Sequence, residues 1–236
     1  MKKNYRIAEL LVEMDTYGRT AVQSEPYRCE AGNTDISLDQ KENKENIRRK
    51  YPTVEDDLCE YMATCGAFYK QLLRYRGFML HSSAVVVDGN AYLFTADSGT
   101  GKSTHAGLWL KMFGDRSFIL NDDKPAVRCI QGTWYAFGTP WSGKNDISVN
   151  TGVPIKGIAI LERGEKNEIT AFTGLDAIMK IMRQCNRPRD PQSRILLMEL
   201  LDKLLTEVPV WKLHCNMDPE AAIVAYEAMS GEKWRK

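Results

Sequence analysis

Apolar residues recur along the chain with two different periods, which predict helices in some stretches and strands in others. The clearest helical pattern begins at Thr53, passes through an acidic first turn, and ends at Gly77. Further helices are expected over residues 104–113, 174–185 and 192–206 and from Asp218 onward. Strands are expected over residues 79–87, 91–95, 117–120, 126–130, 133–137, 155–162 and 208–213. This alternation of strands and helices predicts an α/β domain with a mixed sheet.

The first 54 residues have a different character. Residues 5–38 alternate short apolar runs with turn formers, which predicts short strands and hairpins. Residues 39–50 are almost entirely polar and predict a solvated loop or an exposed helical turn. We therefore expect a small β-rich N-terminal region over residues 1–54 and a main domain over residues 55–236.

Composition narrows the classes of partner. The 236 residues carry 32 basic and 31 acidic side chains, a net charge of +1 that favours neither nucleic acid nor a membrane as partner. No apolar run approaches the roughly 18 residues that span a bilayer. The 6 cysteines are scattered without a C-x-x-C pair, which indicates neither a zinc cage nor a disulfide framework. We expect a cytoplasmic protein with reduced thiols.

A glycine-rich segment carries the strongest chemical signal. Residues 96–103 have the spacing of a phosphate-binding loop and lie between an expected strand and an expected helix. The glycines let backbone N–H groups face an anion, Lys102 reaches the terminal phosphates, and the Ser103 hydroxyl ligates Mg²⁺. The expected nucleotide-binding residues are Ala96, Asp97, Ser98, Gly99, Thr100, Gly101, Lys102, Ser103 and Thr104, where Ala96 replaces the usual glycine. The alternative is a glycine-rich turn that caps a helix.

A second signal is the segment Asn121-Asp122-Asp123-Lys124, which follows an apolar strand. Two adjacent carboxylates at a strand end can divide two tasks, one orienting Mg²⁺ and the other accepting a hydroxyl proton. Taken alone, the segment also fits an ordinary polar turn. A phosphate-binding loop nearby favours the catalytic interpretation.

Three segments together resemble the catalytic core of HPr kinase/phosphorylase and its HPr-kinase-like relatives. They are Leu80-His81-Ser82-Ser83 with the valine run that follows, residues 96–103, and Leu120-Asn121-Asp122-Asp123. The resemblance covers about residues 79–162. It implies a P-loop kinase core related to phosphoenolpyruvate carboxykinase, with antiparallel strands before the loop and flanking helices.

The resemblance also implies roles for individual residues. His81, Lys102 and Asp122 occupy active-site positions of the family, with Asp122 as the general base toward the acceptor hydroxyl. Ser103 is the implied metal ligand, and Asp123 lies near the metal. The implied cofactors are ATP and Mg²⁺, and the implied assembly is an oligomer of identical chains.

The chain also departs from that family. Pro154 stands where HPr kinase/phosphorylase has a metal-binding glutamate, and residues 1–54 replace that enzyme's large N-terminal domain. The chain is more similar to short HPr-kinase-like proteins, some of which accompany peptide-modification systems and phosphorylate a peptide hydroxyl. Phosphoenolpyruvate carboxykinase activity would need a carboxylate-substrate site and a metal-binding Lys/His set, for which the sequence offers no candidate.

Further polar and cationic side chains that could contact the phosphates or the acceptor are expected in two segments. Residues 138–144 read Gly-Thr-Pro-Trp-Ser-Gly-Lys and resemble a loop of the short relatives, which makes Ser142 and Lys144 candidate contacts to phosphate or acceptor. The alternative is a surface turn anchored by Trp141. Arg163 follows an expected strand and is a candidate for neutralising phosphoryl oxygens. Further arginines lie near the junction of two expected helices, where a solvated face is the simpler interpretation: Arg183, Arg187, Arg189 and Arg194.

The resulting expectation is a kinase that moves the γ-phosphoryl group of ATP to a hydroxyl of a small molecule or of a peptide Ser or Thr. Residues 1–54 are the candidate for acceptor recognition because they are unlike the core. The alternative is a nucleotide-binding switch without catalysis in a peptide-modification cassette, and plain nucleotide hydrolysis is a third, weaker interpretation. The sequence leaves open the acceptor, the nucleotide base and the choice among the arginines.

Overall fold

The computed structural model of the chain describes residues 2–234. Its strands are β1 (Lys3–Ile7), β2 (Leu10–Met14), β3 (Ile36–Ser37), β4 (Gly77–Met79), β5 (Ser83–Val87), β6 (Asn90–Thr95), β7 (Ser117–Asn121), β8 (Ala126–Ile130), β9 (Thr133–Phe137), β10 (Gly152–Arg163), β11 (Glu168–Ala171) and β12 (Val210–Cys215). Its α-helices are α1 (Gly18–Ser24), α2 (Lys41–Lys50), α3 (Asp56–Leu72), α4 (Lys102–Phe113), α5 (Gly174–Arg183), α6 (Pro191–Glu207) and α7 (Glu220–Ser230). Short 3-10 turns are η1 (Glu25–Tyr27), η2 (Leu73–Tyr75) and η3 (Gly114–Arg116).

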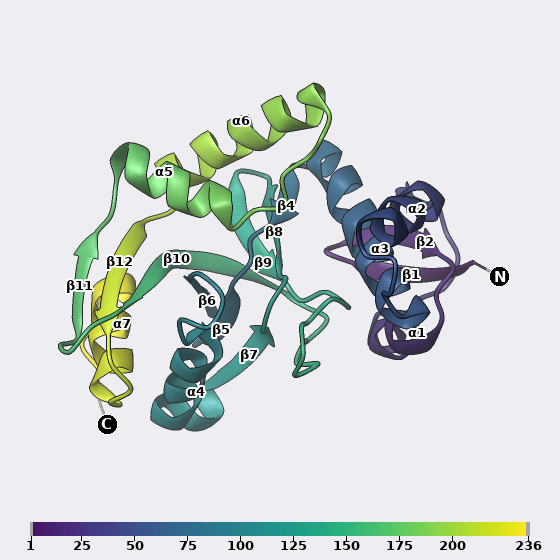
Figure 1. The fold of residues 1–236 in the computed structure, drawn as a ribbon. Coiled ribbons are helices and arrows are strands. Elements are labelled where there is room, and N and C mark those ends of the chain that lie inside the picture. Colours follow the sequence, from purple (N-terminus) through teal and green to yellow (C-terminus); the bar gives the residue numbers. More distant parts are fainter. Residues whose placement is uncertain (1, 235–236) are drawn as a thin grey trace.

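A large mixed sheet forms the centre of the main domain (Figure 1). Its strand order is β4-β8-β9-β10-β6-β5-β7, and β12 and β11 extend it beyond β10. The strands β6, β10 and β12 run parallel, whereas β5 pairs antiparallel with both β6 and β7. The mixed α/β architecture expected from the sequence is therefore confirmed.

Helices cover both faces of this sheet because its strands are apolar on both sides. Along β5, Val85 and Val87 pack with α4 and α7, while Ala84 and Val86 pack with α5 and α6. Figure 1 shows α5 and α6 above the sheet and α4 below it. In the described residues 2–234, no helix combines the length and the hydropathy that crossing a bilayer requires.

Two expectations about element boundaries are wrong. Residues 79–87 were expected as one strand, but β4 ends at Met79 and β5 begins at Ser83, because the two strands pair with different neighbours, β8 and β6. The break between them holds His81. The helix expected from Thr53 begins at Asp56 instead, after an extended residue at Glu55.

The N-terminal region is mixed rather than β-rich. It contains the three-stranded sheet β1-β2-β3, but residues 18–24 form α1 and residues 41–50 form α2. A helix as short as α1 has little stability by itself, so it forms because it packs against the rest of the protein. Thr20 and Ser24 of α1 are fully buried. The region shares one apolar cluster with the rest of the chain, in which Tyr5 and Tyr27 join Phe68 of α3 and Trp141.

Candidate active site

The glycine-rich loop connects β6 to α4 at the carboxyl end of the parallel strands, the edge of a sheet where ligands bind in α/β proteins. Gly99 and Gly101 have φ values of +80° and +120°, and a side chain is strained in either conformation. Lys102 Nζ donates to the carbonyl oxygen of Ala96 at 2.9 Å. Burial lowers the pKa of the Lys102 ammonium, although nearby aspartates including Asp123 oppose that shift. The loop thus places a desolvated cation next to carboxylates.

Asp122 lies at the end of β7 and is 9% exposed. Its Oδ1 accepts a hydrogen bond from Ser83 Oγ at 2.5 Å, and its Oδ2 accepts one from Asn145 Nδ2 at 2.9 Å. Both donors are neutral, so they orient the carboxylate without a cation holding it. A carboxylate oriented in this way can accept a proton from a hydroxyl.

Asp123 is in a different environment from Asp122. His81 Nε2 lies 2.9 Å from its Oδ1, and the Lys124 ammonium pairs with its Oδ2. Burial acts to raise the pKa of the Asp123 carboxyl, but the hydrogen bonds and charges of His81 and Lys124 outweigh it and lower the pKa to about 2. Asp123 is therefore ionised at neutral pH, with both oxygens engaged.

The position of His81 follows from the break between β4 and β5. Its backbone N–H donates to Gln184 O at 2.8 Å, and its Nδ1 lies 3.2 Å from Gln184 Oε1. Gln184 Nε2 in turn donates to Asp97 Oδ1 at 3.1 Å. One glutamine at the end of α5 therefore connects the glycine-rich loop to His81.

The loop after β9 closes the other side of the site. Gly143 has a φ of +75°, and a Cβ there would lie 2.7 Å from Asp123 Cβ, so the loop backbone packs directly against that residue. Trp141 is fully buried and stacks on Phe68 with ring centroids 5.0 Å apart. The tryptophan therefore packs in the core, and the turn that follows it reaches Asp123.

Neither of the two polar candidates in that loop hydrogen-bonds Asp122 within residues 2–234. Ser142 is buried and lies 3.5 Å from Gln23 Nε2 of α1. Lys144 is exposed and forms no hydrogen bond or ion pair with the residues of 2–234. Asn145, which sequence reasoning missed, is the loop residue that bonds Asp122.

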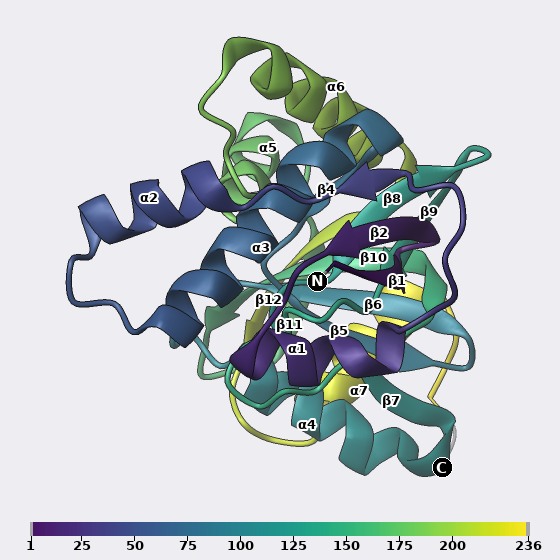
Figure 2. The same ribbon diagram turned by 90° about the vertical axis from the view of Figure 1, so that its right-hand side faces the viewer.

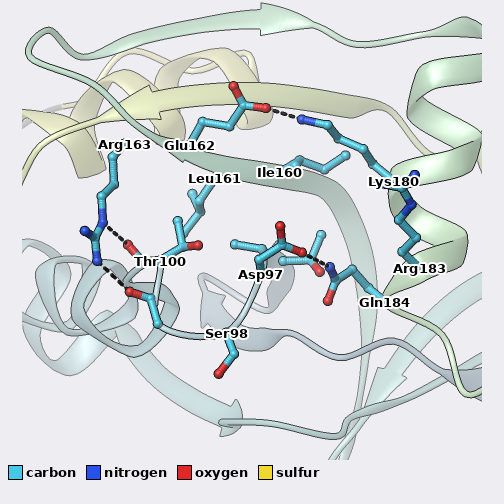
Figure 3. Close-up of a pocket in the computed structure, with 13 residues that line it drawn as sticks. Asp97, Ser98, Thr100, Ile160, Leu161, Glu162, Arg163, Lys180, Arg183 and Gln184 are labelled. Atoms are coloured by element: carbon cyan, nitrogen blue, oxygen red, sulfur yellow. Dashed lines mark hydrogen bonds and ion pairs between the residues drawn. The ribbon is translucent and has the colours of Figure 1, made fainter.

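Arg163 lies at the end of β10 and holds the glycine-rich loop. Its Nη2 donates to Gly99 O at 2.7 Å and its Nε to Thr100 O at 3.4 Å (Figure 3). The guanidinium therefore contacts loop carbonyls and positions the loop.

A pocket of about 540 Å³ lies beside these contacts, between the loop, the end of β10 and α5. Figure 3 shows Lys180 and Arg183 projecting from α5 on the side opposite Arg163. Lys180 pairs with Glu162, and Arg183 is exposed. Of the other predicted arginines, Arg187 and Arg189 line a separate cavity.

Sequence reasoning also missed Ser83 and Gln184. Ser83 belongs to the segment that includes His81, so its motif was available, but its role depends on Asp122 lying opposite it, directly after β7. Gln184 carries no local signal, since its partners His81 and Asp97 are far away along the chain.

The donor set suits a metal that arrives with a nucleotide. The described part of the chain contains no group of 3 or more His, Cys, Asp or Glu residues that could hold a metal by themselves. Mg²⁺ in nucleotide sites takes one or two protein oxygens and completes its shell with phosphates and water. Ser103, exposed at the start of α4, and the adjacent carboxylates supply that smaller set.

Comparison with known proteins identifies a family whose model matches most of the chain. The family model described as "SynChlorMet cassette protein ScmC" matches residues 52–218, which include the glycine-rich loop, Asp122 and Asn145. The solved Hpr(Ser) kinase/phosphatase from Coxiella burnetii aligns with a TM-score of 0.34 at 14% sequence identity, over 65% of this chain and 93% of that one. No curated protein matches the chain.

Proposed function

The chain belongs to the family described as SynChlorMet cassette protein ScmC, and from this premise we propose that it is a phosphotransferase. It would move the γ-phosphoryl group of ATP to the hydroxyl of a small molecule or of a peptide Ser or Thr. The observation that carries the proposal is the Asp122 carboxylate, which two neutral donors orient beside the Lys102 loop.

The nucleotide phosphates would lie on residues 96–104, where the loop amides and the N-terminus of α4 favour an anion. Lys102 would exchange its contact with Ala96 O for a phosphate oxygen, since burial already weakens its hydration. Ser103 and Asp123 would hold Mg²⁺, which would supply positive charge to the transferring phosphoryl group. Arg163 keeps the loop in shape by holding its carbonyls.

Asp122 is the proposed general base. It accepts the proton of the acceptor hydroxyl, the hydroxyl oxygen forms a bond to the γ-phosphorus, and the bond to the bridging oxygen breaks to leave ADP. Asp123 is unsuited to this step because a carboxyl with a pKa of about 2 is a weak base at neutral pH. Its hydrogen bond with His81 and its ion pair with Lys124 instead hold the Asp123 carboxylate in place next to the site.

The N-terminal region is proposed to act on the acceptor side. Arg19 of α1 bonds Gly143 O and lies 2.5 Å from Asp146 Oδ1, so α1 holds the loop that carries Asn145. Pro154 favours a second candidate, a nucleotide-binding switch without transfer, because it stands where the resemblance expects a metal-binding glutamate.

The test is transfer of label from γ-labelled ATP, with Mg²⁺, into a desalted cell extract that is then separated into small-molecule, peptide and protein fractions. We expect label in one fraction with the wild type and in none with Asp122→Asn, while both bind nucleotide. Lys102→Ala should also weaken nucleotide binding. Nucleotide binding without transfer to any fraction would contradict the kinase and favour the switch.

A further inference from the structure

A second cavity, of about 490 Å³, lies between α2, α3 and the segment 186–190 that leads into α6. Figure 2 shows α2 and α3 side by side, with the connection from α5 to α6 passing next to them. Apolar side chains contribute to its lining, among them Ile47 of α2 and Met62 and Tyr69 of α3. We refer to this cavity, with its rim, as the α2/α3 groove.

The rim of the α2/α3 groove is basic. Lys50, Lys70, Arg187 and Arg189 line it and are exposed, and none of them forms an ion pair within the described residues 2–234. The acidic side chains on the rim are Glu42 and Asp190, and Asp190 already caps α6 by accepting from Ser193 N at 2.8 Å. The four cations of the rim outnumber its two carboxylates, which favours an acidic occupant.

One residue that lines the groove, Tyr69, also contacts the backbone next to the candidate active site. The Tyr69 hydroxyl donates to the carbonyl oxygen of Lys124, the residue after Asp123, and lies 3.3 Å from Thr139 Oγ1. Tyr69 is almost fully buried, so its ring forms part of the wall between the groove and the backbone of Lys124.

The segment 184–186 also connects the groove to the candidate active site. Asn186 lines the groove, and Gln184, two residues earlier, bonds His81 and lines the pocket at the glycine-rich loop. The groove and the pocket at the glycine-rich loop are therefore lined by neighbouring residues of one segment, 184–186.

We propose that the α2/α3 groove binds an acidic peptide segment, which is the acceptor and presents its Ser or Thr to Asp122. The proposal rests on the phosphotransfer proposed above and names the substrate class. Apolar side chains lining a groove with a cationic rim suit an extended chain with apolar and acidic side chains, as in other sites that bind acidic motifs through Arg clusters. A small hydroxylated metabolite would need no groove with a cationic rim outside the glycine-rich-loop pocket.

The probe consists of two pools of short fluorescein-labelled peptides, each with a central Ser or Thr, one rich in Asp and Glu and the other rich in Lys and Arg. Binding to the full-length protein is measured by fluorescence anisotropy without nucleotide, so it is independent of transfer. The test variant is Lys70→Glu/Arg189→Glu. The matched control is Lys111→Glu/Lys156→Glu, which reverses the same number of exposed charges outside the groove.

We expect the wild type and the control to bind the acidic pool about tenfold more tightly than the basic pool, with a preference that weakens as salt is added. The test variant should lose or reverse that preference. Equal binding of the two pools, or a preference that Lys70→Glu/Arg189→Glu leaves intact, would overturn the groove assignment.

Transfer of label from γ-labelled ATP to the same pools separates the two proposals. Label entering the acidic pool supports both. Binding of the acidic pool without transfer to any peptide or extract fraction supports the groove and contradicts the kinase. Label found only in the small-molecule fraction supports the kinase and contradicts the peptide acceptor.

Discussion

Replacement of Glu60 by glutamine should remove a dependence of stability on pH that the wild type has. Glu60 lies on α3 with its side chain fully buried, and neither carboxyl oxygen has a well-oriented hydrogen-bond partner within residues 2–234. Desolvation is the main cause that raises the pKa of the Glu60 carboxyl from 4.5 to about 7, against smaller opposing contributions from Thr20 and Lys44. The acidic neighbours Asp57 and Asp56 add to the rise.

The sign follows from proton uptake. A folded-state pKa above the unfolded value means that the folded protein holds the Glu60 proton over a pH range where the unfolded chain has lost it. The free energy of unfolding therefore falls as pH rises from about 4.5 to about 7, and the loss is complete above that range. The pKa difference corresponds to at most about 3 kcal/mol.

The assay is urea unfolding followed by tryptophan fluorescence, at several pH values between about 5 and about 8. Relative to the wild type, Glu60→Gln should gain up to about 3 kcal/mol across this range, because glutamine has no proton to lose. Glu45→Gln, on the exposed face of α2, is the matched control and should track the wild type. A stability difference between Glu60→Gln and wild type that stays constant with pH would refute the reasoning.

Three further predictions concern the candidate active site. Asp122→Asn should lower kcat at least about a hundredfold with the nucleotide Kd unchanged, measured by transfer kinetics and nucleotide titration, and unchanged turnover would exclude it as the base. Lys102→Ala should weaken nucleotide binding at least about tenfold, by about 1.4 kcal/mol or more, as seen by calorimetric titration, and an unaltered Kd would place the phosphates elsewhere. Gly143→Ala should destabilise the fold by about 1–3 kcal/mol in urea unfolding and lower turnover, since its Cβ would lie 2.7 Å from Asp123 Cβ. Gly132→Ala, at a φ of +87° with nothing near its Cβ, shares only the backbone strain, so equal effects of the two would contradict the steric argument.

Local features of the chain were predictable because each is encoded within a few neighbouring residues. Apolar positions on both faces of β5 required a sheet covered by helices on both sides. The glycines of residues 96–103 required a strand, a tight loop and a helix in that order, and the structure has them in that order. The adjacent residues Asp122 and Asp123 likewise predicted the end of a strand, and β7 ends at Asn121.

The assembly of the site depended on tertiary structure. Asn145 and Gln184 reach Asp122 and His81 because loops and strands far apart in the chain meet at one edge of the sheet, and no short pattern encodes such a meeting. The different environments of Asp122 and Asp123, adjacent in sequence, arise because Ser83 and Asn145 donate to Asp122 whereas His81 and Lys124 contact Asp123.

The N-terminal region also combines elements that the sequence predicts with elements that depend on tertiary packing. Its two strands over residues 3–14 follow from their apolar pattern, whereas α1 is too short to be stable alone and forms because Thr20 and Ser24 are buried against the rest of the chain. The basic residues of the α2/α3 groove were visible in the sequence as a polar run and scattered arginines. Only the packing of α2 on α3 beside residues 186–190 places them around one cavity, because the spatial arrangement of charges depends on which elements pack together.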